Sequence, residues 1–409
     1  MSFTQGISGL NAAAADLDTI GNNIANSKTT GYKGSSLQFA DVYASARIGL
    51  GVNVAGVTQN FNTGPLNRTD RELDVAIDGG GFFRLSDNGL TTYSRDGHFI
   101  QTKDGQLANA QGALLSGYNV SGFNGSNPTI SVNGDPQIIQ LPDAGLSAHA
   151  TSEAKMAAAL DAGVTPIDPL MVPFDPDNAA SYHWATPIAV YDSLGNAHSV
   201  TMYFTKTDLN EWVVNGQMML GQGGTTNLTP FTLQFDNGGR LDPGTALTTY
   251  TVTAATLNNG AATLTYDFDF SGSTQTAQSF SSTNPKPDGY PSGLLTSIAI
   301  QEDGTITGSY DNGQRVDLAK IALANFRNVN GLRPVSGNAW VETFTSGQPA
   351  FGTAGNGQFG FLRGGVLEDS NVDMAQELVN LIVSQRNYQA NAQTIKTQDQ
   401  MLQTLVSMR

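Results

Sequence analysis

The chain has 409 residues, a formal net charge of −15, only 13% charged residues and no cysteine. This length leaves room for about two to four domains. The acidic balance and the lack of basic clusters argue against nucleic-acid binding, which needs Lys and Arg on phosphates. The absence of cysteine excludes disulfides, thiolate chemistry and zinc sites built on sulfur.

Residues 1–26 predict an α-helix that carries little charge. Its apolar residues recur at alternating steps of three and four, and Gly21 fills the remaining position of the stripe. The stripe consists of Ile7, Leu10, Ala14, Leu17 and Ile24. The segment has neither a basic n-region nor a continuous apolar run, so we expect no cleavable secretory signal. No part of the chain reaches the roughly 18 consecutive apolar residues of a membrane-spanning helix.

Residues 31–70 predict an irregular extended arm that leads away from this helix. The turn-rich segment 26–31 (NSKTTG) breaks the helical period. Beyond it, apolar residues alternate only in part, as at Val52, Val54 and Val57, and glycines punctuate the segment. We expect residues 361–370 to form the returning half of the same linking arm.

Residues 71–147 and 288–360 predict one all-β domain built from two separated parts of the chain. Short alternating segments are separated by hairpin signals. These signals are DG at 96–97, 104–105 and 303–304, and NG at 312–313.

Residues 148–287 predict an outer β domain inserted into a loop of the first. Strand patterns at 185–191 and 198–204 flank a turn at 192–196 (DSLGN). Residues 151–162 contain alanines that favour a helix, but their apolar residues alternate, so we predict a strand. The expected fold class is therefore mainly β with α-helical termini and two nested β domains.

Residues 373–408 predict a long helix with a heptad stripe that no Gly or Pro interrupts. Its cap is expected at Ser370, Asn371 or Asp373, and Gln376 follows Asp373 at a capping-box spacing. At about 1.5 Å per residue, the helix would be roughly 50 Å long. The stripe consists of Leu378, Leu381, Tyr388, Ala392, Ile395, Leu402 and Val406, with Gln385 and Asp399 as polar members.

The terminal segments 1–30 and 371–409 are expected to form one helical domain. Both helices carry few charged residues, and charges are costly to bury, so we expect the helices to be covered on most sides. One interpretation is ordinary packing of the two helices within one chain. The other is self-assembly, in which helices of other copies also cover flanking residues such as Val379 and Ile382. We favour self-assembly. The expected interface comprises Ile7, Leu10, Leu17, Ile24, Leu378, Leu381, Tyr388, Ile395, Leu402 and Val406.

No segment predicts a catalytic, cofactor or metal site. The glycines at 79–81 precede a strand pattern rather than a helix, which favours a turn over a phosphate-binding loop. The four histidines lack metal-ligand spacing and are expected on the surface or in strands. They are His98, His149, His183 and His198. Asp267 and Asp269 alternate with aromatic residues, which predicts the wet face of a strand rather than an acid–base pair.

Several segments resemble the bacterial flagellar rod and hook axial proteins. Paired signatures occur at the two ends of the chain, in 8–12 (SGLNA), 20–26 (IGNNIAN), 30–33 (TGYK), 368–373 (EDSNVD) and 385–392 (QRNYQANA). Within the β domain, 73–83 and 93–99 (YSRDGHF) are similar to segments that rod and hook subunits share. Residues 191–196 and 321–326 (IALANF) look like hook segments in particular, whereas 151–177 show little similarity.

The resemblance implies a structural hook subunit rather than an enzyme, without cofactors. Such a subunit is located in the extracellular flagellum, where it forms a curved, bendable tube that transmits torque from rod to filament. The implied partners are further copies of the chain, the hook cap, the distal rod, the hook–filament junction proteins and the type III export apparatus, with neither nucleic acid nor membrane insertion. The resemblance also implies an export segment that includes Phe3 and Ile7.

Two alternatives stay open from the residues alone. A distal-rod subunit would share the terminal signatures but would lack the large insert. A monomeric extracellular carbohydrate-binding or hydrolytic β-protein would need a cleft with convergent carboxylates or aromatic residues, and no such spacing is recognisable.

Overall fold

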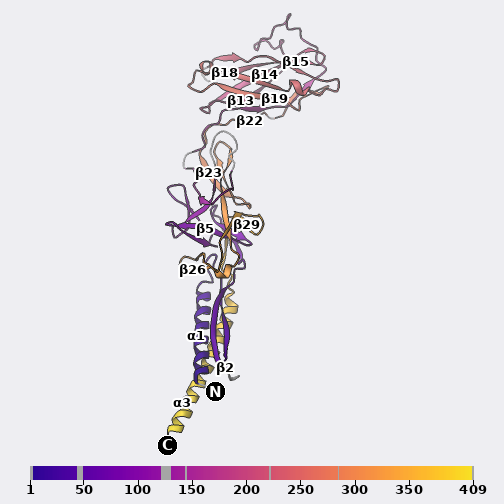
Figure 1. The fold of residues 1–409 in the computed structure, drawn as a ribbon. Coiled ribbons are helices and arrows are strands. Elements are labelled where there is room, and N and C mark those ends of the chain that lie inside the picture. Colours follow the sequence, from indigo (N-terminus) through magenta and orange to yellow (C-terminus); the bar gives the residue numbers. More distant parts are fainter. Residues whose placement is uncertain are drawn as a thin grey trace.

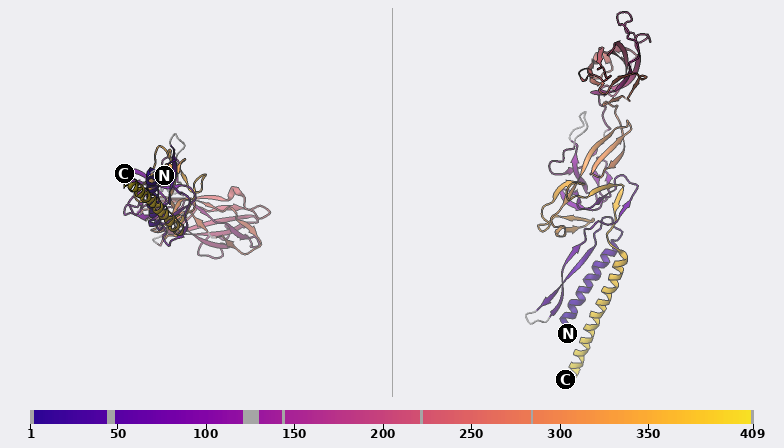
Figure 2. Two further views of the ribbon diagram at one scale, coloured as in Figure 1. Left: turned by 90° about the horizontal axis from the view of Figure 1, so that it is seen from below. Right: turned by 90° about the vertical axis from the view of Figure 1, so that its right-hand side faces the viewer.

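The computed structural model describes residues 3–43, 49–120, 130–142, 145–220, 223–283 and 285–407. The molecule is elongated, with helices at one end, a β domain in the middle and a second β domain at the far end (Figure 1). Both ends of the chain lie at the helical end, so the chain runs out to the far domain and returns (Figure 2). The expected fold class, mainly β with helical termini, is confirmed.

The helical end contains α1 (Phe3–Ala25) and α3 (Met374–Ser407). The cap of α3 is Asp373, whose Oδ1 accepts hydrogen bonds from the backbone N–H groups of Ala375 and Gln376 at 2.9 and 3.2 Å, as an N-cap side chain does. The side chain of Gln376 donates along the helix rather than back to Asp373. None of the described helices is both long and apolar enough to span a membrane.

The segment that was expected to be an irregular arm is largely a regular antiparallel hairpin. Its strands, β1 (Ser35–Tyr43) and β2 (Gly49–Gln59), pair along their length and lie beside α1 (Figure 1). Pairing satisfies the backbone polar groups that a lone arm would leave to water. Gly51 is one of the apparent breaks in the pattern, but a Cβ there would meet Ser8 of α1, so this glycine allows close packing.

The chain that leaves the helical end and the chain that returns to it run side by side. β3 (Leu66–Arg68) pairs with β30 (Val366–Glu368). β4 (Val75–Asp78) pairs with β29 (Phe361–Gly364). Two short ladders therefore tie the outgoing and returning chains together between the hairpin and the middle domain.

A 12-stranded sheet organises the middle domain, with the main path β23-β24-β25-β9-β5-β6-β27-β26. β25, from the returning chain, pairs with β5 and β9 from the outgoing chain. The core includes Phe83, Phe99, Leu115, Ile306 and Leu323, all fully buried. The elements are β5 (Phe82–Asp87), β6 (Leu90–Ser94), β7 (Ile100–Gln101), β8 (Leu107–Ala108), β9 (Leu114–Asn119), β10 (Gln137–Ile138), β23 (Leu295–Ile300), β24 (Thr305–Tyr310), β25 (Arg315–Asn325), η2 (Val329–Gly331), β26 (Arg333–Val335), β27 (Ala339–Val341) and β28 (Ala350–Thr353).

The far domain contains sheets of four, three and five strands around a separate aromatic-rich core. Residues 151–162 form strands, as expected. The elements are β11 (Glu153–Lys155), β12 (Ala158–Asp161), β13 (Trp184–Tyr191), β14 (Ala197–Asp208), β15 (Glu211–Met219), β16 (Thr225–Asn227), β17 (Phe231–Gln234), η1 (Pro243–Thr245), β18 (Leu247–Val252), α2 (Ala254–Leu257), β19 (Leu264–Asp269), β20 (Thr274–Thr276), β21 (Ser281–Ser282) and β22 (Lys286–Pro287).

The expected wet face of β19 is only half correct. Asp267 is exposed, but Asp269 is buried and forms an ion pair of 2.7 Å with Lys155 of β11. Asp269 lies at the end of the strand, where the backbone leaves the sheet toward a turn and the alternation stops. The carboxylate of Asp269 therefore forms a structural contact, whereas that of Asp267 lies in solvent.

Candidate assembly interface

α1 and α3 pack antiparallel, and small residues of α1 bring the two backbones close. A Cβ at Gly6 would lie 2.9 Å from Cγ1 of Ile395, and one at Gly9 would lie 2.9 Å from Nδ2 of Asn391. Ala13 is buried at the same contact, where its carbonyl accepts a hydrogen bond of 3.4 Å from Ser384. Larger side chains at these glycines would push the helices apart.

Asn23 fastens the other end of this helix pair. Its side-chain amide donates to the carbonyl of Ser35 at 2.8 Å and to Oε1 of Glu377 at 3.1 Å. Its Oδ1 accepts a hydrogen bond of 2.9 Å from the backbone N–H of Ser35. One buried amide therefore joins α1, β1 and α3. Sequence reasoning quoted Asn23 within the signature 20–26 (IGNNIAN) but gave it no contact, because a polar residue contributes nothing to an apolar stripe.

These close contacts between α1 and α3 lie beside the apolar stripe expected on α1. The contact uses Gly6, Gly9, Ala13 and Asn23, which are offset by one residue, or about 100° of rotation, from the stripe. Ile7 is exposed, and the other members are partly exposed: Leu10, Ala14, Leu17 and Ile24. Packing of α1 on α3 within one chain therefore leaves much of the N-terminal stripe accessible, and its burial by other copies stays a prediction.

The stripe expected on α3 divides between the two environments. Leu381, Ala392 and Ile395 are half-buried, and Ile395 faces Gly6 of α1. The remaining apolar members, Leu378, Tyr388, Leu402 and Val406, are exposed, and so are the polar members Gln385 and Asp399.

The helical end displays many other large apolar side chains. Exposed on α3 outside the stripe are Met374, Val379, Ile382, Val383 and Met401. The hairpin adds Phe39, Val42 and Val57. α3 also extends past the start of α1, so its last turns have no α1 beside them (Figure 2). Apolar surface of this extent on a soluble chain marks an interaction site.

A buried ionic cluster joins the helical end to the β region. Glu368 of β30 is fully buried and contacts Nζ of Lys33 and, at 3.3 Å, a guanidinium nitrogen of Arg95. Its Oε1 also accepts a hydrogen bond of 2.8 Å from the N–H of Gly64. Burial lowers the pKa of both Lys33 and Arg95, and the Glu368 carboxylate opposes that shift by favouring their charged forms.

Sequence reasoning did not assign this cluster. The available signal was the presence of Lys33 and Glu368 in the paired end signatures at 30–33 (TGYK) and 368–373 (EDSNVD). Lys33 Nζ also donates to the carbonyl of Asn62 at 2.7 Å, and Arg95 donates to the carbonyl of Gly79 at 2.8 Å. Four stretches of chain therefore meet around one carboxylate.

The four histidines were expected on the surface or in strands. His198 lies in β14, and His98 and His149 form isolated β-bridges. The most buried is His198 in β14, whose Nε2 lies 3.0 Å from Oδ2 of Asp192 at the turn that precedes this strand. The described residues contain no cluster of metal-ligating side chains. Glycines 79–81 connect β4 to β5, so they form a turn between strands rather than the start of a helix.

Comparison with known proteins gives matches along the whole chain. Four family models match: the flagella basal body rod protein model (4–33), the flagellar hook protein FlgE/F/G D1 domain (76–152), the flagellar basal body protein FlaE D2 domain (159–290) and the flagellar basal body rod FlgEFG protein C-terminal model (363–408). Among curated proteins, the chain is 46% identical to flagellar hook protein FlgE of Salmonella typhimurium and 45% identical to that of Escherichia coli K12, covering 100% of both sequences in each pair.

Solved structures contain the same fold. The crystal structure of Helicobacter pylori flagellar hook protein FlgE2 superposes with a TM-score of 0.57 at 15% sequence identity. The match covers 74% of the present chain and 100% of the other. At this identity the superposition is evidence of a shared fold alone.

Proposed function

The chain belongs to the flagellar hook protein family, and from this premise we propose that α1 and α3 are the surfaces through which copies polymerise. The protein is a structural subunit of the hook in the extracellular part of the bacterial flagellum. The relatives matched over their full length are hook proteins, so the alternatives of a distal-rod subunit and a carbohydrate-binding protein are set aside. We propose that the chain has no enzymatic activity.

The observation that supports this interface is that α1 contacts α3 through one face and leaves its apolar stripe, on a neighbouring face, largely uncovered. Small and polar residues hold α1 on α3 within one chain, which leaves Ile7 exposed and Leu10, Leu17 and Ile24 partly exposed. On α3, Leu378, Tyr388, Leu402 and Val406 are likewise uncovered. Helices from neighbouring copies would bury both sets at once and remove their apolar surface from water.

The domains have separate roles in this proposal. The helical segments 1–30 and 371–409 form the inner wall of the tube, and the arm, 31–70 and 361–370, links copies along it. The middle domain, 71–147 and 288–360, and the outer domain, 148–287, lie outside and slide against their neighbours as the tube bends.

Export and assembly require further partners. We propose that Phe3 and Ile7 belong to the segment read by the flagellar export apparatus, and that the polymer contacts the hook cap, the distal rod and the hook–filament junction proteins. Both Phe3 and Ile7 are exposed. The absence of cysteine suits passage of an unfolded chain through a narrow channel without cross-linking.

Charge substitutions on the helices test the interface. Leu378→Asp changes a side chain that is 47% exposed in the single chain, so the fold should survive. In the polymer it would bury an unpaired charge at a cost of roughly 3 kcal/mol or more, which corresponds to about a 100-fold loss of subunit affinity. We expect no tubes in electron micrographs of concentrated protein and an unchanged β-type circular dichroism spectrum. Leu381→Asp and Ile24→Asp should act in the same direction.

The matched control is Leu90→Asp, at the start of β6, where Leu90 is 59% exposed. It makes the same chemical change away from the helices and should polymerise normally. Tubes of normal length from Leu378→Asp, Leu381→Asp and Ile24→Asp would refute the assignment of α1 and α3 as the polymer interface.

A further inference from the structure

We propose a second contact between copies, in which Phe344 of one copy enters a groove lined by Arg68, Ile300, Arg363 and Val366 of the next. We call the first surface the Phe344 loop (342–346) and the second the Arg68 groove. This inference rests on the proposed function, because it assumes a polymer. It adds a contact between β regions to the contact between helices.

The Phe344 loop displays an aromatic ring in solvent on a hydrogen-bonded backbone. The side chain of Phe344 is fully exposed, although its loop is tightly bonded. Thr343 Oγ1 donates to the carbonyl of Gly331 at 2.6 Å, and the buried Ser346 hydroxyl donates to the carbonyl of Thr343 at 2.9 Å. Because the backbone of the loop is already bonded, binding would order only the phenyl side chain, and such a pre-organised aromatic residue is typical of an interface anchor.

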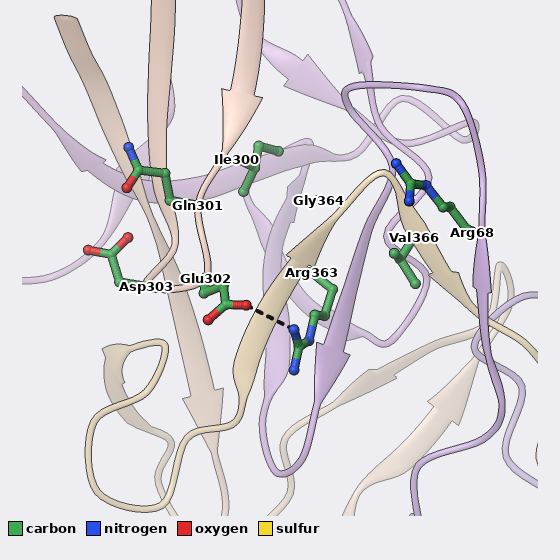
Figure 3. A pocket seen from close by; sticks show the side chains of 8 residues that line it. All are labelled: Arg68, Ile300, Gln301, Glu302, Asp303, Arg363, Gly364 and Val366. Carbon is green, nitrogen blue, oxygen red and sulfur yellow. Dashed lines mark hydrogen bonds and ion pairs between the residues drawn. The ribbon is translucent and has the colours of Figure 1, made fainter.

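The Arg68 groove is an open depression of about 690 Å³ beside the turn between β23 and β24. Ile300 and Val366 supply apolar walls, and Arg68 and Arg363 supply cations (Figure 3). Arg363 is held in place by Glu302 at 2.8 Å and by Asp78 at 3.3 Å. Guanidinium groups beside apolar walls suit a phenyl ring, because Arg stacks favourably on aromatic faces.

The two surfaces also carry unsatisfied charges of opposite sign. Within the described part of the chain, Arg68 forms no ion pair, and neither does Glu342. Glu342 accepts only a hydrogen bond of 3.3 Å from the hydroxyl of Tyr93. Glu342 precedes Phe344 by two residues, so a ring seated in the groove would bring this carboxylate toward Arg68 of the other copy.

The positions of the surfaces fit a repeating contact. The Phe344 loop follows β27, which lies beside β26 at one end of the 12-stranded sheet path, whereas the groove adjoins β23 at the other end. Different surfaces at opposite edges of one domain form heterologous contacts. Such contacts generate open helical polymers when the rotation does not close, which is the assembly that a tube requires.

Charge reversal with rescue tests the contact in the full-length chain. Arg68→Glu and Glu342→Arg should each raise the concentration needed for polymerisation by roughly tenfold, comparable to losing one interface anchor, and the double variant should restore it. If only repulsion between copies of equal net charge controlled polymerisation, the two single variants would behave differently from each other. Starting from −15, the first change gives −15 − 2 = −17 and the second −15 + 2 = −13, so the two would shift polymerisation in opposite directions.

Two further variants complete the experiment. Phe344→Ala should weaken polymerisation by roughly tenfold, whereas Leu90→Ala, an equally apolar change in the same domain, should not. Because the chain has no cysteine, Thr345→Cys combined with Val366→Cys should give a ladder of disulfide-linked multimers on oxidation of the polymer.

Normal polymerisation of Arg68→Glu, Glu342→Arg and Phe344→Ala, without a cross-linked ladder, would overturn this contact and leave the helical interface intact. Failure of the unmodified chain to polymerise would instead overturn the proposed function, and this inference with it.

Discussion

At the scale of single residues, the most consequential group is the carboxylate of Glu368. It is fully buried between Lys33 and Arg95, and it joins the start of the arm to the returning chain. A buried ion pair adds little net stability compared with apolar packing, but removal of one partner is costly, because it leaves uncompensated charge in the interior. We infer that this cluster fixes the orientation of the helical end relative to the β region.

Glu368→Gln tests that inference. The variant leaves two buried cations without their anion, and we expect a loss of about 3–5 kcal/mol in the free energy of unfolding, measured by urea denaturation. Amide exchange should accelerate at 31–34 and 366–369. Glu302→Gln, whose carboxylate is 67% exposed and pairs with exposed Arg363, is the control and should cost less than about 1 kcal/mol. Equal effects of the two substitutions would contradict a special role for the buried cluster.

A second residue-scale prediction concerns Asp192 at the turn before β14. Burial alone would raise the pKa of Asp192, but hydrogen bonds donated by His198, Asn196 and Asn259 outweigh it, so that this pKa lies at about 2. A folded-state pKa below the unfolded value stabilises the fold above the unfolded pKa, and the gain is lost as the pH falls toward 2.

Asp192→Asn should therefore destabilise the far domain by about 2 kcal/mol at pH 7. Urea denaturation curves of this variant and the unmodified chain should converge as the pH falls from about 4 to about 2. A stability difference that does not change with pH would exclude the carboxylate charge as its cause.

At the scale of elements, the helices α1 and α3 depend on surroundings that one chain only partly provides. Their mutual contact runs along α1 from Gly6 to Asn23, but α3 continues beyond it (Figure 2), and many of its large apolar side chains stay exposed. Helical stability in proteins comes mainly from packing of an apolar face rather than from propensity. We therefore expect the helical end to be ordered fully only within the polymer.

Amide exchange measures this expectation directly. In the monomer, α1 and α3 should exchange rapidly, fastest after Ile395, and both should become protected on polymerisation. β5 and β25, which lie in a fully buried core, provide the internal reference and should be protected in both states. Strong protection from Leu378 to Leu402 in the monomer would contradict the transition from disorder to order.

At the scale of the whole molecule, the distribution of exposed apolar side chains and the sequence of domains along the subunit both favour an inward-facing helical end. The helical end gathers exposed large apolar side chains, while the two β domains enclose cores of their own. Because exposed large apolar side chains are concentrated along α3 and the hairpin, we propose that the elongated subunit (Figure 1) packs with its helical end inward. In this proposal the β domains remain outside, where small changes in their contacts would accommodate bending.

Local patterns in the sequence were sufficient for much of this architecture. The cap at Asp373, the uninterrupted heptads of α3 and the alternation in residues 151–162 each depend on neighbours within a few positions, so their elements could be predicted. The hairpin of β1 and β2 could not, because its glycines read as breaks, and only the approach of Ser8 to Gly51 gives one of them a packing role. The prediction that Asp269 is exposed was wrong for the same reason, because its ion pair with Lys155 joins strands that are far apart in the sequence.

The sequence by itself determined the class of fold, the two terminal helices with apolar stripes and the signatures of a flagellar axial subunit. Periodicity, turn chemistry and short motifs are local properties of the chain. Only the tertiary structure decided which face of α1 meets α3 and that Lys33 and Arg95 share Glu368. It also decided that the Phe344 loop follows β27 near one end of the strand path of the middle domain, whereas the Arg68 groove adjoins β23 at the other end. Those relations join residues far apart in the chain, and their energy comes from burial and charge pairing that exist only once the chain has folded.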